Sequence, residues 1–280
     1  MYKEKYKLVE GKTKIIWKDP LNEHSVLIQN KPVITAGDGK KRDHLRNKDV
    51  YATKTTCNVF EFLKAKRIPT HYIKPHNNSV TFLARKVEMI PMEIVVRRLA
   101  YGSYLKRHPE IPEGAVFSPL TTEFFLKDDE NHDPLMVWDD FDDKFTLCDA
   151  KQPLGDGWIR LFDPLSIVNG SLLPQNTQEI QNIRKLAVEI FRPLEKAWKD
   201  LGVRLVDLKI EMGFDVETGD LLVADVIDND SWRIWPQGDK SQMKDKEVYR
   251  NLVEVTPEAL EAVRDNYSWV AEMTGKFADS

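Results

Sequence analysis

Two segments with alternating apolar and charged residues, separated by a turn, constrain the fold of this chain more than any other feature. They span residues 205–213 and 224–233, and an alternation with a period of two predicts a β-strand in each. Residues 217–220 lie between them and have the composition of a hairpin turn. We therefore expect a hairpin that gathers its charged residues on one face.

The charges on that face favour a ligand. Alternate residues of a strand share a face, so Asp207, Lys209 and Glu211 lie together, and Asp225 begins the second strand near them. Neighbouring carboxylates repel each other unless a positive charge lies between them, and a hard cation with oxygen ligands is the simplest candidate. Lys209 could bind a phosphate. From these residues alone the alternative is an edge hairpin whose charges face water, and other parts of the chain decide against it.

Composition excludes several classes of protein. The chain has 280 residues, of which 41% are hydrophobic and 31% charged, so it can bury one large core or two adjoining ones. A net charge of −4 argues against a general binder of nucleic acids or membrane surfaces. Cys57 and Cys148 form neither a metal motif nor a disulfide framework, and residues 1–5 lack the apolar core of a signal peptide. We expect a cytoplasmic protein without nucleic-acid or membrane partners.

The N-terminal region predicts strands around a turn that suits phosphate. Gly11 to Lys14 combine a glycine, two lysines and a hydroxyl, which can offer backbone N–H groups and ammonium charges to phosphate oxygens. A lysine-rich surface turn is the alternative, because the spacing is not that of a Walker A loop. The loop at residues 34–43 carries two glycines and a basic run, which fits a loop near an anion or an ordinary flexible loop. Strands are predicted at residues 7–10, 15–17 and 25–29.

Three amphipathic helices are predicted from apolar residues with helical spacing. They span residues 48–66, 178–201 and 257–276. Gly202 stands where a C-terminal cap belongs, and Thr256 with Pro257 forms a typical helix start. The apolar stripe of the second helix is assigned to core packing. Further strands are predicted at residues 71–73 and 80–87.

Two further segments place polar residues at the ends of strands. Arg97 ends a β-branched run that would hold its guanidinium rigidly, while Gly102 and Ser103 follow in a loop. Phosphate or carboxylate binding fits this arrangement, and an internal ion pair of Arg97 fits it equally well. The strand at residues 123–126 enters an acidic turn, residues 127–134, that suits either a binding cleft or a solvated loop.

Together these motifs resemble one family. Their order and approximate spacing resemble those of the SAICAR synthetase family. Its members are the phosphoribosylaminoimidazole-succinocarboxamide synthases of de novo purine biosynthesis. The resemblance runs from about Lys7 to about Trp269. Six motifs in register are far more specific than any one of them. They occupy residues 11–14, 35–39, 95–103, 127–134, 205–211 and 225–233.

The resemblance implies a reaction and a fold. ATP and L-aspartate would convert 5-amino-4-carboxyimidazole ribonucleotide (CAIR) into SAICAR, ADP and phosphate, with Mg²⁺ required. The implied fold is a two-lobed, ATP-grasp-like α+β arrangement that holds the nucleotide between its lobes. We expect a β-rich nucleotide-binding lobe at residues 1–86 and an α+β lobe for substrate and metal at residues 87–280.

The resemblance also assigns residues. The metal ligands fall on Glu211 and Asp225. The nucleotide-binding residues fall on Gly11, Lys12, Thr13, Lys14, Arg85, Glu88, Met89, Lys209, Glu211 and Asp225. The substrate-binding residues fall on Asp38, Arg97, Ser103, Lys127, Asp133, Asp207, Asp230 and Arg233. The catalytic residues are expected to be Lys209, Asp207, Arg97 and Arg233, with Asp207 as a candidate acceptor for the proton of the aspartate amine.

Some questions stay open at this stage. Residues 145–176 look like an insertion relative to animal members of the family. Animal members carry a C-terminal aminoimidazole ribonucleotide (AIR) carboxylase domain, so the chain is either monofunctional or one domain of a longer protein, and a homo-oligomer is possible. A kinase-like phosphotransferase acting on a small anionic substrate is the alternative function. An inactive scaffold is disfavoured because the charged residues of the expected cleft are all present.

Overall fold

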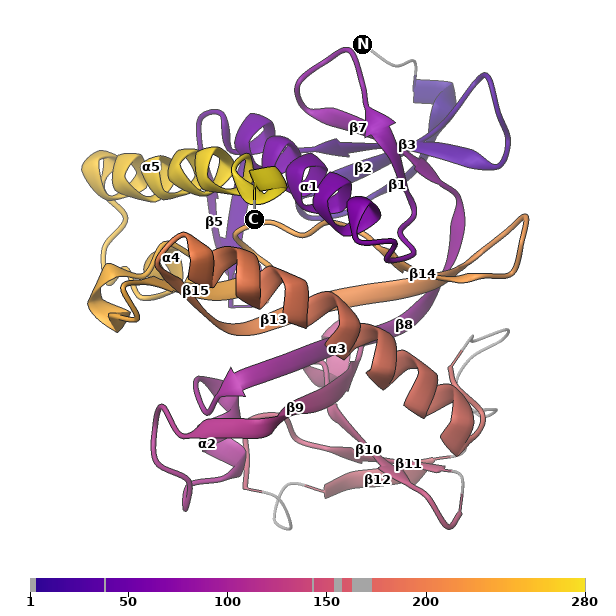
Figure 1. Cartoon of the computed structure of the whole chain (residues 1–280), viewed down its shortest axis with the longest axis vertical. Coiled ribbons are helices and arrows are strands. Elements are labelled where there is room, and N and C mark those ends of the chain that lie inside the picture. The colour runs from indigo at the N-terminus through magenta and orange to yellow at the C-terminus, as the bar shows by residue number, and fades with distance from the viewer. Residues whose placement is uncertain (1–3, 38, 143, 154–157, 163–172, 280) are drawn as a thin grey trace.

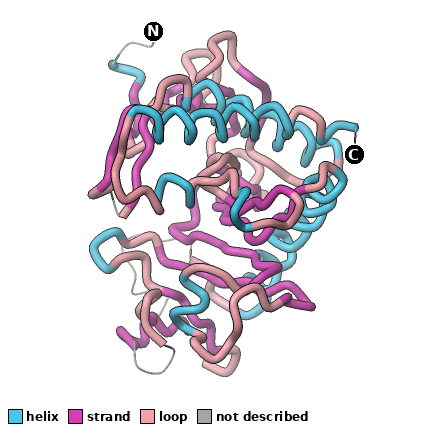
Figure 2. The backbone as a smooth tube through the Cα atoms, turned by 90° about the vertical axis from the view of Figure 1, so that its left-hand side faces the viewer, coloured by secondary structure: helices cyan, strands magenta, loops and turns pink. Residues whose placement is uncertain are grey.

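The computed structural model describes residues 4–37, 39–142, 144–153, 158–162 and 173–279. Their strands form two main antiparallel sheets and one small one, with helices packed against them (Figure 1). Both chain termini lie in the upper part of the molecule, above the strands of the larger sheet (Figure 2). None of the described helices has the length and apolarity needed to cross a lipid bilayer.

The N-terminal region forms a five-stranded sheet with the order β1-β2-β3-β7-β6. A separate two-stranded sheet of β4 and β5 lies between β3 and β6 along the chain. The strands are β1 (Lys7–Glu10), β2 (Lys14–Lys18), β3 (Ser25–Asn30), β4 (Val33–Ala36), β5 (Lys41–His44), β6 (Tyr72–Pro75) and β7 (Thr81–Arg85). Helix α1 (Lys48–Ala65) packs on the five-stranded sheet, and α5 (Pro257–Thr274) lies beside α1. The predicted strands at residues 7–10, 15–17 and 25–29 and the first predicted helix are confirmed, to within a residue or two.

The larger sheet has eight strands in the order β12-β11-β10-β9-β8-β13-β14, with β15 also paired to β13. Its strands are β8 (Val87–Leu99), β9 (Val116–Leu126), β10 (Leu135–Asp139), β11 (Lys144–Cys148), β12 (Trp158–Phe162), β13 (Val203–Asp215), β14 (Leu221–Ala224) and β15 (Trp232–Pro236). Helix α3 (Thr177–Asp200) crosses one face of this sheet (Figure 1). Two short helices, α2 (Ser103–Arg107) and α4 (Glu247–Arg250), lie in the connections.

The end of α3 and the start of α5 carry the predicted signals, and the cap at the start of α3 is one that the sequence analysis did not name. Asn176 accepts a hydrogen bond from the Glu179 backbone N–H at the start of α3, and Thr256 does the same for Ala259 at the start of α5. Gly202 adopts a φ of 72° just after α3, a conformation that costs glycine little. Local sequence therefore determined where these helices begin and end.

One apolar core joins the two sheets. Phe60 of α1 and Phe82 of β7 belong to the same buried cluster as Ile190 and Trp198 of α3. Trp198 is fully buried and stacks on Trp269 of α5. The expected division at residues 86 and 87 coincides with the change of sheet between β7 and β8, while α5 returns to pack on α1. The two-lobe division stays a proposal, with the C-terminal helix lying against the N-terminal part.

The charged hairpin differs from its prediction in two respects. Its second strand was predicted at residues 224–233, but β14 ends at Ala224 and β15 begins at Trp232. Asp225 has a φ of 62°, a left-handed conformation that ends the strand. The alternative of a solvated edge hairpin is wrong, because β13 is paired on both sides and the Asp207 and Glu211 residues are only 4% and 6% exposed.

Two other predictions are corrected or left open. The strand predicted at residues 80–87 is divided, because the chain leaves the first sheet after Arg85 and enters the second at Val87. Within the segment 145–176, β12 pairs with β11 at the edge of the larger sheet, and residues 154–157 and 163–172 lie outside the described residues. The interpretation of this segment as an insertion stays a prediction.

Candidate active site

A cavity of about 1040 Å³ is lined by residues of both main sheets and the loops beside them. Most of its lining side chains are polar or charged. It brings together fourteen residues that the sequence singled out, which are Gly11, Lys12, Thr13, Lys14, Arg97, Ser103, Lys127, Asp133, Asp207, Lys209, Glu211, Asp225, Asp230 and Arg233. Residues separated by two hundred positions in the chain thus share one binding volume.

Lysines and carboxylates alternate at one end of the cavity. The Lys14 ammonium contacts both carboxylate oxygens of Asp225. Lys127 Nζ lies 2.7 Å from Glu211 Oε2, and this carboxylate belongs to the middle of β13. Lys14, at the start of β2, therefore meets the carboxylate that follows β14, while Lys127, from the turn after β9, meets the charged face of β13.

A further lysine of the same face is held from the neighbouring strand. Lys209 Nζ lies 2.5 Å from Glu93 Oε1, and the two residues belong to the paired strands β13 and β8. The ammonium also lines the cavity, where phosphate oxygens could reach it.

The charges at this end are strongly coupled. Burial raises the pKa of Glu211, and the charge of Asp225 raises it further. Burial also opposes ionisation of Asp225, but the ammonium of Lys14 outweighs it and lowers the pKa of this carboxyl. Burial alone would lower the pKa of Lys14 and of Lys209, whereas the carboxylates beside them raise both. Both lysines are therefore charged at neutral pH, and a cation bound beside Glu211 would favour the ionised form of its carboxyl.

The donor set of Glu211 and Asp225 fits Mg²⁺. Within the described part of the chain, no group of three or more His, Cys, Asp or Glu residues could hold a metal by itself. Mg²⁺ is commonly bound through only one or two protein carboxylates, with phosphate oxygens of the substrate and water completing its shell. Two coupled carboxylates beside lysines therefore suit a metal that arrives with a nucleotide.

The other end of the cavity contains two arginines joined by one carboxylate. Asp207 of β13 lies opposite Arg97 of β8 and opposite Arg233 of β15 in the register of the sheet. Its Oδ2 accepts hydrogen bonds from Arg97 Nη1 at 2.8 Å and from Arg233 Nη1 at 2.5 Å. Asp207 thus fixes two guanidinium groups beside each other, an arrangement that suits a phosphate or carboxylate ligand.

The backbone approaches Arg233 closely at Gly102. A Cβ atom at this position would lie 2.7 Å from Arg233 Nη2, and Gly102 has a φ of 63°. Ser103 begins α2 immediately afterwards and lines the cavity. A glycine at position 102 therefore lets the backbone come this close to the Arg233 guanidinium.

Asp230 lies in a cluster of charges that the sequence did not reveal. Its Oδ2 lies 3.6 Å from Lys48 Nζ and 3.0 Å from Lys246 Nζ, and its Oδ1 accepts a hydrogen bond from the Tyr267 hydroxyl. Lys48 is only 1% exposed, yet it lines the cavity. A lysine at the first position of a helix is ordinarily solvated, so no local signal marks this one.

Two further acidic residues, one lining the cavity and one behind it, were also missed. Asp129 Oδ2 lies 2.9 Å from Lys12 Nζ, which links the turn after β1 to the acidic turn after β9. Glu123 lies behind Arg97 and holds it from β9. The signal for Glu123 was present, because a single carboxylate directly precedes the apolar run 124–126.

Among the residues that the structure describes, three of the predicted ones do not line this cavity. Arg85 is bound to Asp215, with 3.0 Å between Nη1 and Oδ2, and it donates to the Thr70 carbonyl oxygen. Glu88 and Met89 are exposed near the start of β8. Asp38 lies outside the described residues. The nucleotide-binding role of Arg85, Glu88 and Met89 stays a prediction.

Comparison with known proteins decides the family. The model of the SAICAR synthetase family matches residues 7–266. The chain belongs to this family. Its architecture is accordingly the SAICAR synthetase fold, a mixed α+β arrangement with several antiparallel sheets, and its activity is that of a ligase of de novo purine biosynthesis.

Individual relatives agree along nearly the whole chain. The phosphoribosylaminoimidazole-succinocarboxamide synthase of Herpetosiphon aurantiacus is 42% identical over 271 residues, which cover 97% of this chain and 98% of that protein. A solved structure described as SAICAR synthetase in complex with ADP has a TM-score of 0.71 and 27% identity, and the match covers 93% of this chain and 97% of that one.

Other relatives are longer. The human bifunctional phosphoribosylaminoimidazole carboxylase/phosphoribosylaminoimidazole succinocarboxamide synthetase is 41% identical over 266 residues, which cover 95% of this chain but 57% of that protein. The chain spans only 27% of the bifunctional purine synthesis protein of Dictyostelium discoideum. In such relatives the SAICAR synthetase region is one part of a longer chain.

Proposed function

We propose that this chain uses ATP to condense CAIR with L-aspartate, giving SAICAR, ADP and phosphate through an acyl-phosphate intermediate. The observation that carries the proposal is that one cavity holds a lysine-carboxylate end and a two-arginine end. The first suits the phosphates of a nucleotide and the second suits an anionic substrate. The ADP bound to the related SAICAR synthetase supports the use of ATP.

The chemistry explains why a nucleotide is needed. A carboxylate is a poor electrophile, because oxide is a poor leaving group. In the first step a carboxylate oxygen of CAIR attacks the terminal phosphorus of ATP, the bond from that phosphorus to the bridging oxygen breaks, and ADP leaves. In the second step the aspartate amine attacks the acyl carbon, phosphate leaves with the bonding electrons, and the nitrogen loses a proton. The product contains a new amide bond.

The lysines are assigned to the transferring phosphoryl group. Negative charge spreads over its oxygens during transfer, and catalysis consists mainly of positioning and electrostatic stabilisation. Lys14 and Lys209 line the cavity and are held beside carboxylates, so they can exchange these partners for phosphate oxygens without crossing solvent. Gly11, Lys12 and Thr13 would contact the same phosphates from the turn.

Glu211 and Asp225 are assigned to Mg²⁺. When bound, the metal would neutralise part of the phosphate charge and fix the orientation of the triphosphate. The coupled carboxylates supply the oxygen ligands that it prefers.

The arginines are assigned to the ribonucleotide substrate. Arg97 and Arg233, with Ser103, would bind anionic groups of CAIR and hold its carboxylate near the phosphoryl group. Lys127, Asp133 and Asp230 line the same volume and are assigned to substrate binding. Positioning of this kind converts a reaction between separate molecules into one within a complex.

Asp207 keeps its assignment as the candidate proton acceptor. Its Oδ2 already accepts two hydrogen bonds from guanidinium groups. A proton from the amine would therefore go to Oδ1. A homo-oligomer, and fusion to or association with an AIR carboxylase, also stay proposals, and the bifunctional relatives support the latter.

The experiment is an assay of ADP release with ATP, Mg²⁺, CAIR and L-aspartate, in which each component is omitted in turn. The proposal expects SAICAR and ADP in equal amounts, and loss of steady ADP release without aspartate. If omission of aspartate left ADP release unchanged, the chain would be a kinase-like phosphotransferase and the proposal would be wrong.

A further inference from the structure

Behind the two-arginine end of the cavity lies a carboxylate that contacts two arginines from different elements. Glu123 of β9 accepts from Arg97 Nε through Oε2 and from Arg107 Nη2 through Oε1, both at 2.5 Å. Neither Glu123 nor Arg107 lines the cavity. The pair therefore lies on the protein side of Arg97.

The Arg107 side chain is also buried and makes contacts besides the one to Glu123. Its side chain is 0% exposed, and it donates from Nη1 to the Ala150 carbonyl oxygen at 2.6 Å and packs over the Phe125 ring. Burial by itself raises the pKa of Glu123, but the charges of Arg97 and Arg107 outweigh it and lower the pKa, so the carboxylate stays ionised. Without that charge, two guanidinium groups would lie close together in a buried region.

The contacts hold two of the three nitrogens of the Arg97 guanidinium from opposite sides of β8. Glu123 engages Nε from β9, and Asp207 engages Nη1 from β13, the strand on the other side of β8. Within the described residues no hydrogen bond engages Nη2. Since the guanidinium is planar and rigid, fixing two of its nitrogens sets the direction in which the third one points.

Arg107 also ends the helix that carries a second substrate contact. Helix α2 spans Ser103–Arg107, and Ser103 lines the cavity. The Arg107–Glu123 ion pair thus connects this helix to Arg97. One buried pair can set the distance between two groups assigned to the same substrate.

We propose that Glu123, braced by Arg107, is a positioning residue that orients Arg97 for the anionic group of the ribonucleotide substrate. The inference rests on the proposed function, because it takes Arg97 as a substrate contact. Glu123 acts through Arg97 and does not touch the substrate. Its loss should weaken binding of the ribonucleotide and leave nucleotide binding at the other end of the cavity unchanged.

The test is a double-mutant cycle of Glu123→Gln and Arg97→Lys, read as the KM for CAIR, the KM for ATP and the ADP affinity by calorimetry. Glu123→Gln should raise the KM for CAIR about 10-fold and change ADP affinity less than 2-fold. In the Arg97→Lys background the same substitution should change the KM for CAIR less than 2-fold, because there is no longer a guanidinium to orient.

The matched control is Glu195→Gln. Glu195 holds Arg98, the neighbour of Arg97, through two hydrogen bonds of 2.6 and 2.9 Å, outside the cavity. It should leave the KM for CAIR unchanged. If Glu123→Gln lowers the yield of folded protein, Arg107→Lys is the second variant. It keeps the positive charge but cannot bind the Ala150 carbonyl oxygen and Glu123 through two separate nitrogens, as Arg107 does. It should raise the KM for CAIR about 3-fold, again only when Arg97 is present.

The outcomes separate the inference from the proposed function. If Arg97→Lys itself leaves the KM for CAIR unchanged, Arg97 does not bind the ribonucleotide and the proposed assignment fails. If Arg97→Lys raises that KM but the Glu123 and Arg107 variants do not, only the positioning role is overturned. Additive effects of Glu123→Gln and Arg97→Lys would overturn it as well.

Discussion

Lys14 of β2 and Asp225, the residue that follows β14, form an ion pair that joins the two main sheets across the cavity. Both residues are assigned to ATP and its metal. The contact means that a bound nucleotide would meet an ammonium and a carboxylate that already neutralise each other. Loss of either residue therefore leaves the other partly buried without its partner.

Replacement of Lys14 tests its assignment to the phosphates. Lys14→Met should lower kcat/KM for ATP about 30-fold, from the roughly 2 kcal/mol of a charge-assisted hydrogen bond. Steady-state kinetics with CAIR and aspartate saturating measures this. Lys18→Gln, on the exposed end of the same strand, is the control and should behave as the unaltered protein. Equal ATP kinetics in Lys14→Met and Lys18→Gln would contradict the assignment.

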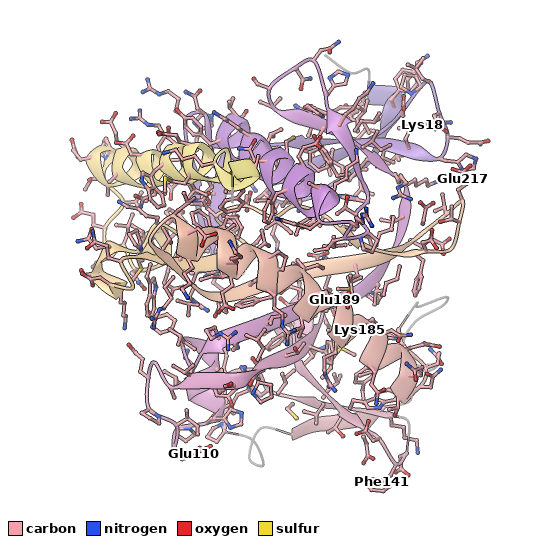
Figure 3. All side chains as sticks on the ribbon, in the orientation of Figure 1. Lys18, Glu110, Phe141, Lys185, Glu189 and Glu217 are labelled. Atoms are coloured by element: carbon pink, nitrogen blue, oxygen red, sulfur yellow. The ribbon has the colours of Figure 1, made fainter. Side chains whose placement is uncertain are left out.

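Replacement of the two acidic residues tests the metal site. In the unaltered chain, Mg²⁺ should strengthen ADP binding measured by calorimetry, and a chelator should abolish turnover. Glu211→Gln and Asp225→Asn should each remove most of the Mg²⁺ effect on ADP binding. Glu217→Gln, in the turn of the same hairpin and at the edge of the molecule in Figure 3, should keep it. An undiminished Mg²⁺ effect in both variants would rule out these ligands.

Asp207→Asn tests the proposed proton acceptor. We expect it to slow amide formation while ADP binding stays intact, because Asp207 contacts the arginines at the far end of the cavity from the lysine-carboxylate end. Rapid-quench measurement of SAICAR and calorimetry with ADP separate the two effects. Asp19→Asn changes a buried carboxylate outside the cavity and serves as control. Unchanged turnover in Asp207→Asn would reject the role.

Gly102→Ala tests the close approach to Arg233. The new Cβ would lie 2.7 Å from Arg233 Nη2, so the guanidinium must move and the KM for CAIR should rise at least about 10-fold. Gly114→Ala is a matched control, because Gly114 also has a positive φ, of 82°, but no atom lies within 4 Å of its added Cβ. The two variants share the backbone strain, roughly 1–2 kcal/mol. A similar KM in both would exclude the contact as the cause.

The raised pKa of Asp245 predicts that the stability of the fold depends on pH. Burial raises its pKa to about 6, while its carboxylate accepts hydrogen bonds from the Ile234 and Glu247 backbone N–H groups. The folded protein thus binds this proton more tightly than the unfolded chain, whose value lies near 3.8. The contribution of Asp245 to the free energy of unfolding should therefore fall as pH rises from about 4 to about 6, by on the order of 3 kcal/mol, and stay constant above.

The measurement is the difference in unfolding free energy between the unaltered chain and Asp245→Asn from pH 4 to 8. Asparagine does not titrate, so any hydrogen bond it loses adds an offset that does not depend on pH. A difference that stays flat across pH 4 to 6 would show that the Asp245 carboxyl is not perturbed.

Local sequence predicted the long helices correctly but revealed less of the site. The end of α3 and the start of α5 followed from Gly202 and Thr256, because caps and turns depend on a few neighbouring residues. The shared face of Asp207, Lys209 and Glu211 was readable because strand periodicity is local.

The contacts between residues of different strands and helices could not be predicted from local sequence. Nothing near Glu123 in the chain indicates that it lies between Arg97 and Arg107, and nothing near Lys48 indicates that it reaches Asp230. These contacts depend on which strands and helices become neighbours. That choice is made by burial of the whole apolar core.

The sequence by itself determined the family, the location of most elements and the residue types at both ends of the cavity, because six motifs in register carry that information. Only the tertiary structure decided that β13 has paired strands on both sides, and therefore that its charges are buried and must be paired. A charge on an exposed strand needs only water, whereas a charge on a buried one requires a partner from another strand.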